Sequence, residues 1–210
     1  MEGRRGIVAD ECSCGTSGDT ERARIQPFWP PNNRYNLMSE IQAIYDAIKE
    51  HYGFNDWGKT TAANLVGRAL ALGALPSVEK HDNFQLERRV ELPEDRPGFR
   101  AYIEYYKSTS DEGIRFAVTI LQNQTVEQAH EELAEELSKS MAPSLPRAEE
   151  KNIHVGHIAF AGHGATQTAV RFVRANLFIK VESVGPKHAD VKDLAEAIDK
   201  QMLAHSGEER

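Results

Sequence analysis

The feature that most constrains the fold is a change of hydrophobic period part-way along the chain. Before it, apolar residues recur every three or four positions. After it, apolar and polar residues alternate in three consecutive segments, residues 84–92, 99–106 and 114–121, separated by turn-rich breaks. Alternation places successive side chains on opposite faces of a strand. The three segments therefore predict an antiparallel meander with one buried and one solvent-facing side.

The second half of the chain predicts three more strands. Residues 155–160, 168–173 and 177–184 are rich in β-branched and aromatic residues, which favour strands. Arg174-Ala175-Asn176 separates the last two segments. Because Asn tolerates a left-handed backbone, we expect a tight turn there. One long bent strand is the alternative.

Four segments have the period of a helix. Apolar residues fall on one face over residues 37–52, where Gly53 ends the pattern, and over residues 59–72. Residues 125–141 and 188–204 each carry a further apolar stripe. The sequence therefore predicts two helices before the first strand and one helix after each group of three strands.

The third of these helices has the clearest start. Thr125 precedes the apolar stripe, and Gln128 follows three residues later. In this pattern each side chain satisfies an otherwise unpaired backbone amide of the first turn. We therefore expect Thr125 to be the N-cap.

The element order predicts an α+β fold in which a βββα unit occurs twice. We expect a mostly antiparallel six-stranded sheet with helices 125–141 and 188–204 on its apolar face. The first two helices could cover an edge or the opposite face. Residues 1–33 predict a flexible tail, residues 34–206 a single domain and residues 207–210 a frayed end.

Charge and cysteine content narrow the classes of partner. The 32 acidic and 25 basic residues of the 210-residue chain give a net charge of −7, which disfavours nucleic acid and anionic membranes. No stretch approaches the roughly 20 apolar residues of a membrane span. Cys12 and Cys14 are the only cysteines, so no disulfide framework, metal site or cofactor is predicted. Few cysteines and an initiating Met favour the cytoplasm, with a mature secreted form as the alternative.

The strongest binding candidate is the second face of the predicted sheet. The alternation assigns to this face Glu87, Arg89, Tyr102, Glu104, Tyr106, Arg115, Thr119, Arg171, Lys180 and Glu182. Tyrosine and arginine offer a large rigid surface and several donors, so we name Tyr102, Tyr106, Arg115 and Arg171 as ligand-binding residues. The alternative is a solvated or helix-covered face held together by cross-strand charge pairs.

Three histidines cluster at His154, His157 and His163. Along a strand His154 and His157 point to opposite faces, so only His157 and His163 could converge. These two are the candidates for a catalytic general base.

Two functional hypotheses follow. The first is a non-catalytic binding module that receives a small molecule or a protein partner on its Tyr/Arg face. The second is a small enzyme with a pocket between the sheet and the first two helices, in which His157 or His163 is the base and Tyr102 or Arg115 orients the substrate. Self-association through an uncovered sheet edge is a further alternative.

Overall fold

The computed structural model describes the greater part of the chain. The described residues are 43, 46–54, 57, 70, 71, 73–93, 98–140 and 144–206. The predicted tail 1–33, both cysteines, most of the predicted helix 59–72 and the predicted frayed end 207–210 lie outside them.

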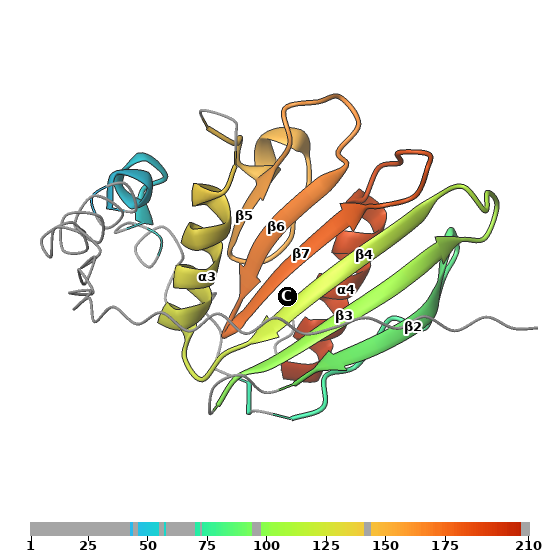
Figure 1. Cartoon of the computed structure of the whole chain (residues 1–210), viewed down its shortest axis with the longest axis horizontal. Helices are drawn as coiled ribbons and strands as arrows, with labels where there is room; N and C mark the ends of the chain where they lie inside the picture. Colours follow the sequence, from blue (N-terminus) through green and yellow to red (C-terminus); the bar gives the residue numbers. More distant parts are fainter. Residues whose placement is uncertain are drawn as a thin grey trace, which may run out of the picture.

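Seven strands form one antiparallel sheet (Figure 1). Their order across the sheet is β1-β2-β3-β4-β7-β6-β5, and every neighbouring pair runs antiparallel. The strands are β1 (Lys80–His81), β2 (Phe84–Leu92), β3 (Arg100–Ser108), β4 (Arg115–Gln122), β5 (Ile158–Ala161), β6 (Ala169–Arg174) and β7 (Leu177–Ser183). The predicted α+β class and antiparallel sheet are confirmed.

The predicted number of six strands is too low by one. The additional strand, β1, has two residues, which pair with Gln85 and Phe84 at the start of β2. Two residues are too few to show an alternation in the sequence. The βββα repeat also holds only in outline, because β1 precedes the first unit and a short 3-10 helix, η2 (Ala148–Lys151), precedes the second.

The two long helices lie where the sequence predicts them, but with different bounds: α3 (Val126–Ser138) ends at Ser138 instead of residue 141, and α4 covers residues 192–206 instead of 188–204. In α3, the Thr125 side chain accepts from the Gln128 N–H and the Gln128 side chain accepts from the Thr125 N–H, so the predicted N-cap is confirmed. Residues 46–51 are helical, and Gly53 follows with φ +67°, a value that favours glycine. The last helix is α4 (Lys192–Ser206).

The two long helices cover opposite faces of the sheet, which corrects the prediction that both lie on one face. The α4 side chains Leu194, Ile198 and Met202 share a core with Ile120 and Phe172 of the sheet. A second core, under α3, contains Leu133, Leu137, Phe160, Val173 and Phe178. Phe172 and Val173 are adjacent on β6, and Phe172 packs in the core under α4 whereas Val173 packs in the core under α3. The β5–β7 half is thus buried on both sides, which requires its near-continuous apolar sequence.

The predicted tight turn between β6 and β7 is confirmed, but its left-handed residue is Ala175, with φ 49°, and not Asn176. The fully buried Asn176 side chain has another task. It accepts from the Leu70 N–H at 2.7 Å and donates to the Leu70 and Asn123 carbonyl oxygens at 2.9 and 2.5 Å. Asn176 therefore ties the chain before β1 to the middle of the sheet.

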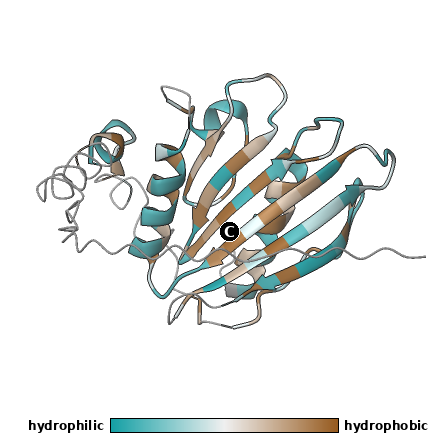
Figure 2. Cartoon of the chain, in the orientation of Figure 1, coloured by the Kyte–Doolittle hydropathy of each residue, from teal (hydrophilic) through white to brown (hydrophobic). Residues whose placement is uncertain are grey.

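The face that α3 occupies is only partly covered. Helix α3 contacts β6 and β7, and no described helix lies over β2, β3 and β4 on that side (Figure 1). Hydrophilic and hydrophobic residues alternate along these strands (Figure 2). We call the face under α4 the closed face, and the part of the other face formed by β2, β3, β4 and the end of β7 the open half.

Candidate functional site

The four predicted ligand-binding residues do not lie on one face. Tyr102 and Tyr106 pair in register with Ile120 and Phe116 and belong to the closed-face core. Arg115 points to the opposite face, because it is the neighbour of Phe116 on β4. The predicted common face is therefore wrong. The hydropathy of β3 is misleading here, because tyrosine buries its ring while its hydroxyl keeps a polar partner.

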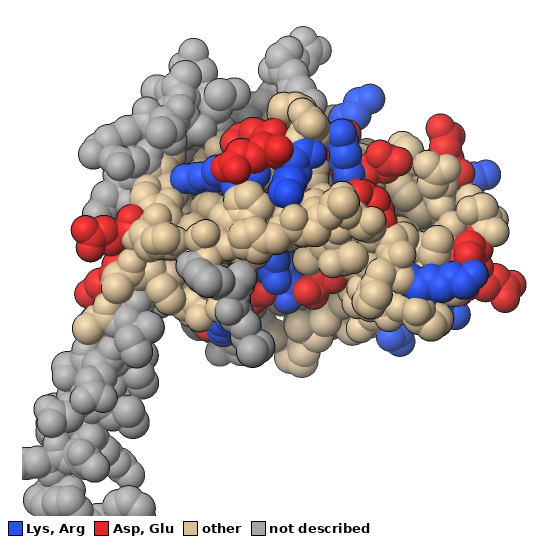
Figure 3. All heavy atoms as spheres, turned by 90° about the horizontal axis from the view of Figure 1, so that it is seen from above, with Lys and Arg blue, Asp and Glu red and all other residues tan. Residues whose placement is uncertain are grey.

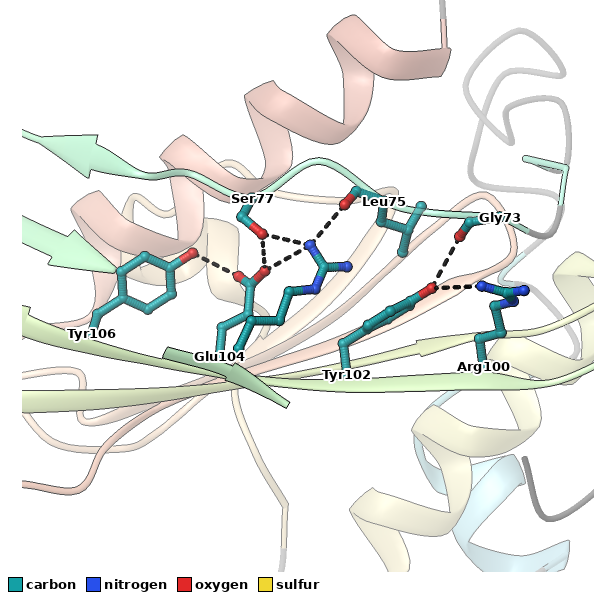
Figure 4. A network of polar contacts seen from close by, with 8 residues as sticks. Gly73, Leu75, Ser77, Arg100, Tyr102, Glu104 and Tyr106 are labelled. Carbon is teal, nitrogen blue, oxygen red and sulfur yellow. Dashed lines mark hydrogen bonds and ion pairs between the residues drawn. The ribbon is translucent and has the colours of Figure 1, made fainter. Parts of the chain in front are cut away.

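On the closed face, Glu104 is the centre of a buried polar network. Its carboxylate is 1 % exposed and accepts from the Tyr106 hydroxyl at 2.6 Å and from the Ser77 hydroxyl at 2.5 Å. Arg89 Nη1 lies 3.2 Å from the same carboxylate and donates to the Leu75 carbonyl oxygen at 2.7 Å. Figure 4 shows Glu104 and Tyr106 rising from β3 towards the segment that carries Ser77.

Tyr102 extends this network along β3. Its hydroxyl donates to the Gly73 carbonyl oxygen at 3.0 Å, and the Arg89 guanidinium carbon lies 4.1 Å from the centre of its ring. Burial, together with the charge of Glu104, raises the pKa of the Tyr106 phenol, so it remains a donor at neutral pH. These groups fasten residues 73–77 onto the closed face and satisfy one another.

Arg171, the fourth predicted residue, is held by α3. Its Nε lies 3.1 Å from Glu136 Oε1, and Lys180 Nζ lies 2.8 Å from the same oxygen. Burial opposes the charge of Glu136, but the hydrogen bonds and charges of Lys180 and Arg171 outweigh burial and lower its pKa. Arg171 therefore serves to pair α3 with β6, and it does not lie beside Arg115.

The open half contains a hollow of about 520 Å³, and Arg115 lines it. The other lining residues are Glu87, Arg88, Tyr105, Tyr106, Phe116 and Val184. Tyr106 has no exposed surface, so its ring does not reach a ligand there. Of the four predicted residues, only Arg115 thus presents its side chain to this hollow.

A β-bulge builds one wall of the hollow. Leu86 pairs with Tyr106 and Arg88 pairs with Tyr105, so Glu87 is the extra residue of β2. The bulge turns Arg88 onto the open half, where its guanidinium carbon lies 4.1 Å from the centre of the Tyr105 ring. Such stacking fixes the orientation of the guanidinium.

The opposite wall is held by the backbone around Arg115. The Val184 and Gly185 N–H groups both donate to the Arg115 carbonyl oxygen, at 2.9 and 3.2 Å. A Cβ on Gly185 would lie 2.6 Å from the Arg115 nitrogen and would overlap the Gly113 carbonyl oxygen. Glycine is therefore required at this close approach of two loops.

The open half also carries exposed apolar side chains. Among the described residues the large exposed hydrophobics are Val90, Leu92 and Val184, with exposed fractions of 38, 37 and 52 %. Val90 and Leu92 pair in register with Ile103 and Ala101, which places them on the same face as Tyr105. A shared position on one face favours an interaction surface over scattered exposure.

The two candidate histidines do not converge. His163 is exposed and its Nε2 contacts the Ser144 carbonyl oxygen, whereas His157 precedes β5 and its Nε2 lies 2.7 Å from Nε2 of His130 on α3. Burial, with the charges of His130 and Arg174, lowers the pKa of His157 to about 3. A group with such a pKa is a weak base near neutral pH. The third histidine of the cluster, His154, is exposed.

His130 is the residue that the sequence reasoning missed. It is buried on the inner side of α3, between Ala129 and Leu133, and burial lowers its pKa. The edge of its ring packs against Trp57, with ring centres 5.6 Å apart. A polar residue on the apolar side of a predicted helix is the signal that could have identified it.

The described part of the chain holds no group of three or more His, Cys, Asp or Glu side chains arranged for a metal ion. Within the same part, no helix has the length and apolar character needed to cross a membrane. Comparison of the chain with protein-family models, with curated proteins and with solved structures finds no match.

Proposed function

We propose that this protein is a non-catalytic binding domain whose ligand occupies the hollow on the open half of the sheet. The observation that carries the proposal is a hollow of about 520 Å³ in which Arg88, Tyr105 and Arg115 meet. This volume is within the usual range of small-molecule sites, roughly 300–1,000 Å³. The walls are built by strands and by a glycine-dependent contact, so little ordering is needed when a ligand binds.

The side chains of the hollow favour binding over chemistry. The described residues that line it are arginine, tyrosine, glutamate and apolar residues, with no serine, cysteine or histidine among them. A hydrolytic or acid-base site needs a nucleophile and a base within hydrogen-bond reach of each other. The catalytic alternative, with His157 or His163 as base, stays a hypothesis that neither residue's surroundings favour.

Chemical-shift mapping tests this proposal. The full chain, labelled with 15N, is titrated with a library of small fragments, and we expect the perturbed amides to cluster at residues 87, 88, 105, 115 and 184. Val184→Glu places a charge in the hollow at an exposed position and should abolish these shifts. Thr166→Glu, the same new side chain at an exposed loop position, is the matched control and should retain them. Fragments that bind only elsewhere would refute the proposal.

A protein partner is the second candidate, and the outer edge of β2 favours it. Strand β1 pairs only with Gln85 and Phe84, so residues 87–92 pair with β3 on one side and have no strand partner among the described residues on their outer edge. A second copy paired antiparallel about Val90 would set Val90 against itself and Arg89 against Glu91 on both sides of the axis. Light scattering over a concentration series tests this pairing. We expect a dimer that Val90→Lys dissociates, and a monomer at every concentration would exclude it.

A further inference from the structure

We infer that the hollow selects a ligand in which an anionic group, such as a carboxylate, phosphate or sulfonate, is joined to a flat apolar ring system. This inference rests on the proposed function and specifies the ligand class. Its basis is an excess of cationic side chains that have no acidic partners among the described residues, next to exposed apolar surface.

The charge balance of the hollow differs from that of the chain. Arg115 pairs in register with Lys107, so two cations stand directly opposite each other on β4 and β3. Like charges in this position destabilise a sheet. Neither side chain forms an ion pair with a described residue. A bound anion would relieve the repulsion between them, so the strand pair is matched to an anionic ligand.

The acidic side chains near the hollow do not cancel this charge. Glu87 is one carboxylate against the lining cations Arg88 and Arg115, and Lys107 adds a third positive charge opposite Arg115. Glu182 on β7 already has a cationic partner, because its Oε1 lies 3.0 Å from Lys180 Nζ. Elsewhere the two signs are mixed: in the view of Figure 3, basic and acidic side chains lie in small groups together.

Asp111, in the turn before β4, is also occupied. Its carboxylate lies 2.7 Å from Lys187 Nζ, and this hydrogen bond lowers the pKa of Asp111. Asp111 is therefore charged and paired at neutral pH, and the cations of the hollow keep their net positive charge in a chain of net charge −7.

Arg88 supplies the geometry for anion recognition. Its stacking on Tyr105 occupies one face of the guanidinium and leaves the N–H donors, which lie in the guanidinium plane, able to bind. A planar fork of donors matches two oxygens of a carboxylate or phosphate. The anionic end of a ligand is thus expected between Arg88 and Arg115.

The apolar part of the ligand is assigned to the Val184 side of the hollow. Val184 is 52 % exposed, and its backbone is fixed by the hydrogen bond to Arg115. Covering this side chain with a ring removes apolar surface from water, which contributes roughly 25 cal/mol per Å². A free inorganic anion would leave this surface exposed, so the ring distinguishes the inferred ligand from a simple ion.

Two matched fluorescent probes test the inference. 8-Anilinonaphthalene-1-sulfonate carries rings and an anion, whereas N-phenyl-1-naphthylamine carries the same rings without charge. Both are titrated against the folded full chain, and the bound position is mapped from amide shifts. We expect the sulfonate to bind more tightly and Arg115→Gln to weaken it about tenfold, since a hydrogen bond to a charged group contributes about 1.5 kcal/mol or more. Lys107→Gln should weaken it by less, because Lys107 lies opposite Arg115 and outside the lining of the hollow. Neutral-probe affinity should not change.

Lys200→Gln, on the exposed side of α4, removes the same charge at a distance and should leave both affinities unchanged. Equal binding of both probes in the hollow, unaffected by Arg115→Gln and Lys107→Gln, would overturn the anion selectivity and leave the proposed binding domain intact. Probe binding that Val184→Glu does not weaken, or no binding in the hollow, would overturn both.

Discussion

Two clusters of tyrosine, arginine and glutamate lie back to back on the same strands. The closed-face cluster, Arg89 with Tyr102, Glu104 and Tyr106, is sealed, and its central carboxylate is 1 % exposed and bonded to three partners. The open-half cluster, Arg88 with Glu87, Tyr105 and Arg115, contains the same residue types but an excess of positive charge. The difference indicates that charge balance and burial, and not residue type, separate a structural polar cluster from the cluster that we propose to bind a ligand.

The bulge at Glu87 creates this difference. Arg88 and Arg89 are adjacent in the sequence, yet the first stacks on Tyr105 and the second on Tyr102, on opposite faces. A strand alternates its side chains, so one arginine must face each way. The bulge sets which residues they meet.

Removal of the central carboxylate of the closed cluster gives the largest expected effect. Glu104→Ala leaves the Arg89 guanidinium without its carboxylate partner, and it removes the acceptor of the Ser77 and buried Tyr106 hydroxyls. Breaking a buried pair by removing one partner typically costs about 3 kcal/mol or more. We expect a loss of this size in the free energy of unfolding, measured by urea denaturation.

Glu91→Ala is the control for that comparison. Glu91 pairs with Arg100 at 3.3 Å on the surface, where an ion pair is worth about 0.5 kcal/mol. Similar losses for the two alanine variants would mean that the closed cluster does not differ from surface charge pairs.

The order and positions of most strands follow from the sequence, because alternation and β-branched content are local signals. The faces do not. Assignment of Tyr102, Glu104 and Tyr106 to a polar face ignores that a tyrosine hydroxyl and a carboxylate can satisfy each other in a core. A shift of one residue in the register of a strand moves every one of its side chains to the opposite face of the sheet.

The candidate site shows the same limit. Arg115 was identifiable as an exposed cation on β4, but its position beside Arg88 depends on the register of three strands and on a bulge. His130 meets His157 across 27 residues of chain. Contacts of this kind depend on tertiary packing, which no local pattern contains.

His130 and His157 lie under α3, on the covered part of the same face as the open half, and they extend the comparison to that part. The pKa of His157 is lowered to about 3 from its ordinary value of 6.5, chiefly by burial, and burial also lowers the pKa of His130. Above pH 6.5 both histidines are mainly neutral in the folded and in the unfolded chain, so protonation of the pair takes nothing from the free energy of unfolding. As the pH falls below 6.5, the unfolded chain binds protons that the folded chain excludes.

Stability should therefore fall as the pH decreases from 6.5 towards 3. The proton excluded from His157 costs about 1.4 kcal/mol per pH unit, or about 2 kcal/mol by pH 5. Glu127, Glu131 and Arg174 also act on these rings and are present in all variants. Urea denaturation at pH 7 and pH 5 measures the loss, which His157→Phe should reduce and His163→Gln should not. Equal losses in all three proteins would contradict the assignment.

Gly185→Ala tests whether the wall of the hollow is as rigid as the closed face. A Cβ there meets backbone atoms of Gly113 and Arg115, which cannot rotate away. Overpacking of this kind costs about 1–3 kcal/mol. We expect a loss near the lower end, because the loops can separate slightly, together with weaker probe binding. Gly164→Ala, in an exposed loop, is the control, because a Cβ there would lie 3.2 Å from the Thr166 carbonyl oxygen, its nearest neighbour. Unchanged stability and binding in Gly185→Ala would show a compliant wall.

Arg115→Gln is expected to change the free energy of unfolding least. The sign of this change distinguishes the open-half cluster from the closed-face cluster. Loss of a charge from the closed cluster is destabilising because its partners are left unpaired, but Arg115 stands opposite Lys107 and has no acidic partner among the described residues. Its removal relieves a repulsion, so we expect the free energy of unfolding to rise by at most about 0.5 kcal/mol at low salt. The gain should vanish in high salt, because salt screens exposed charges. A loss of stability instead would mean that Arg115 has a structural role like that of Arg89.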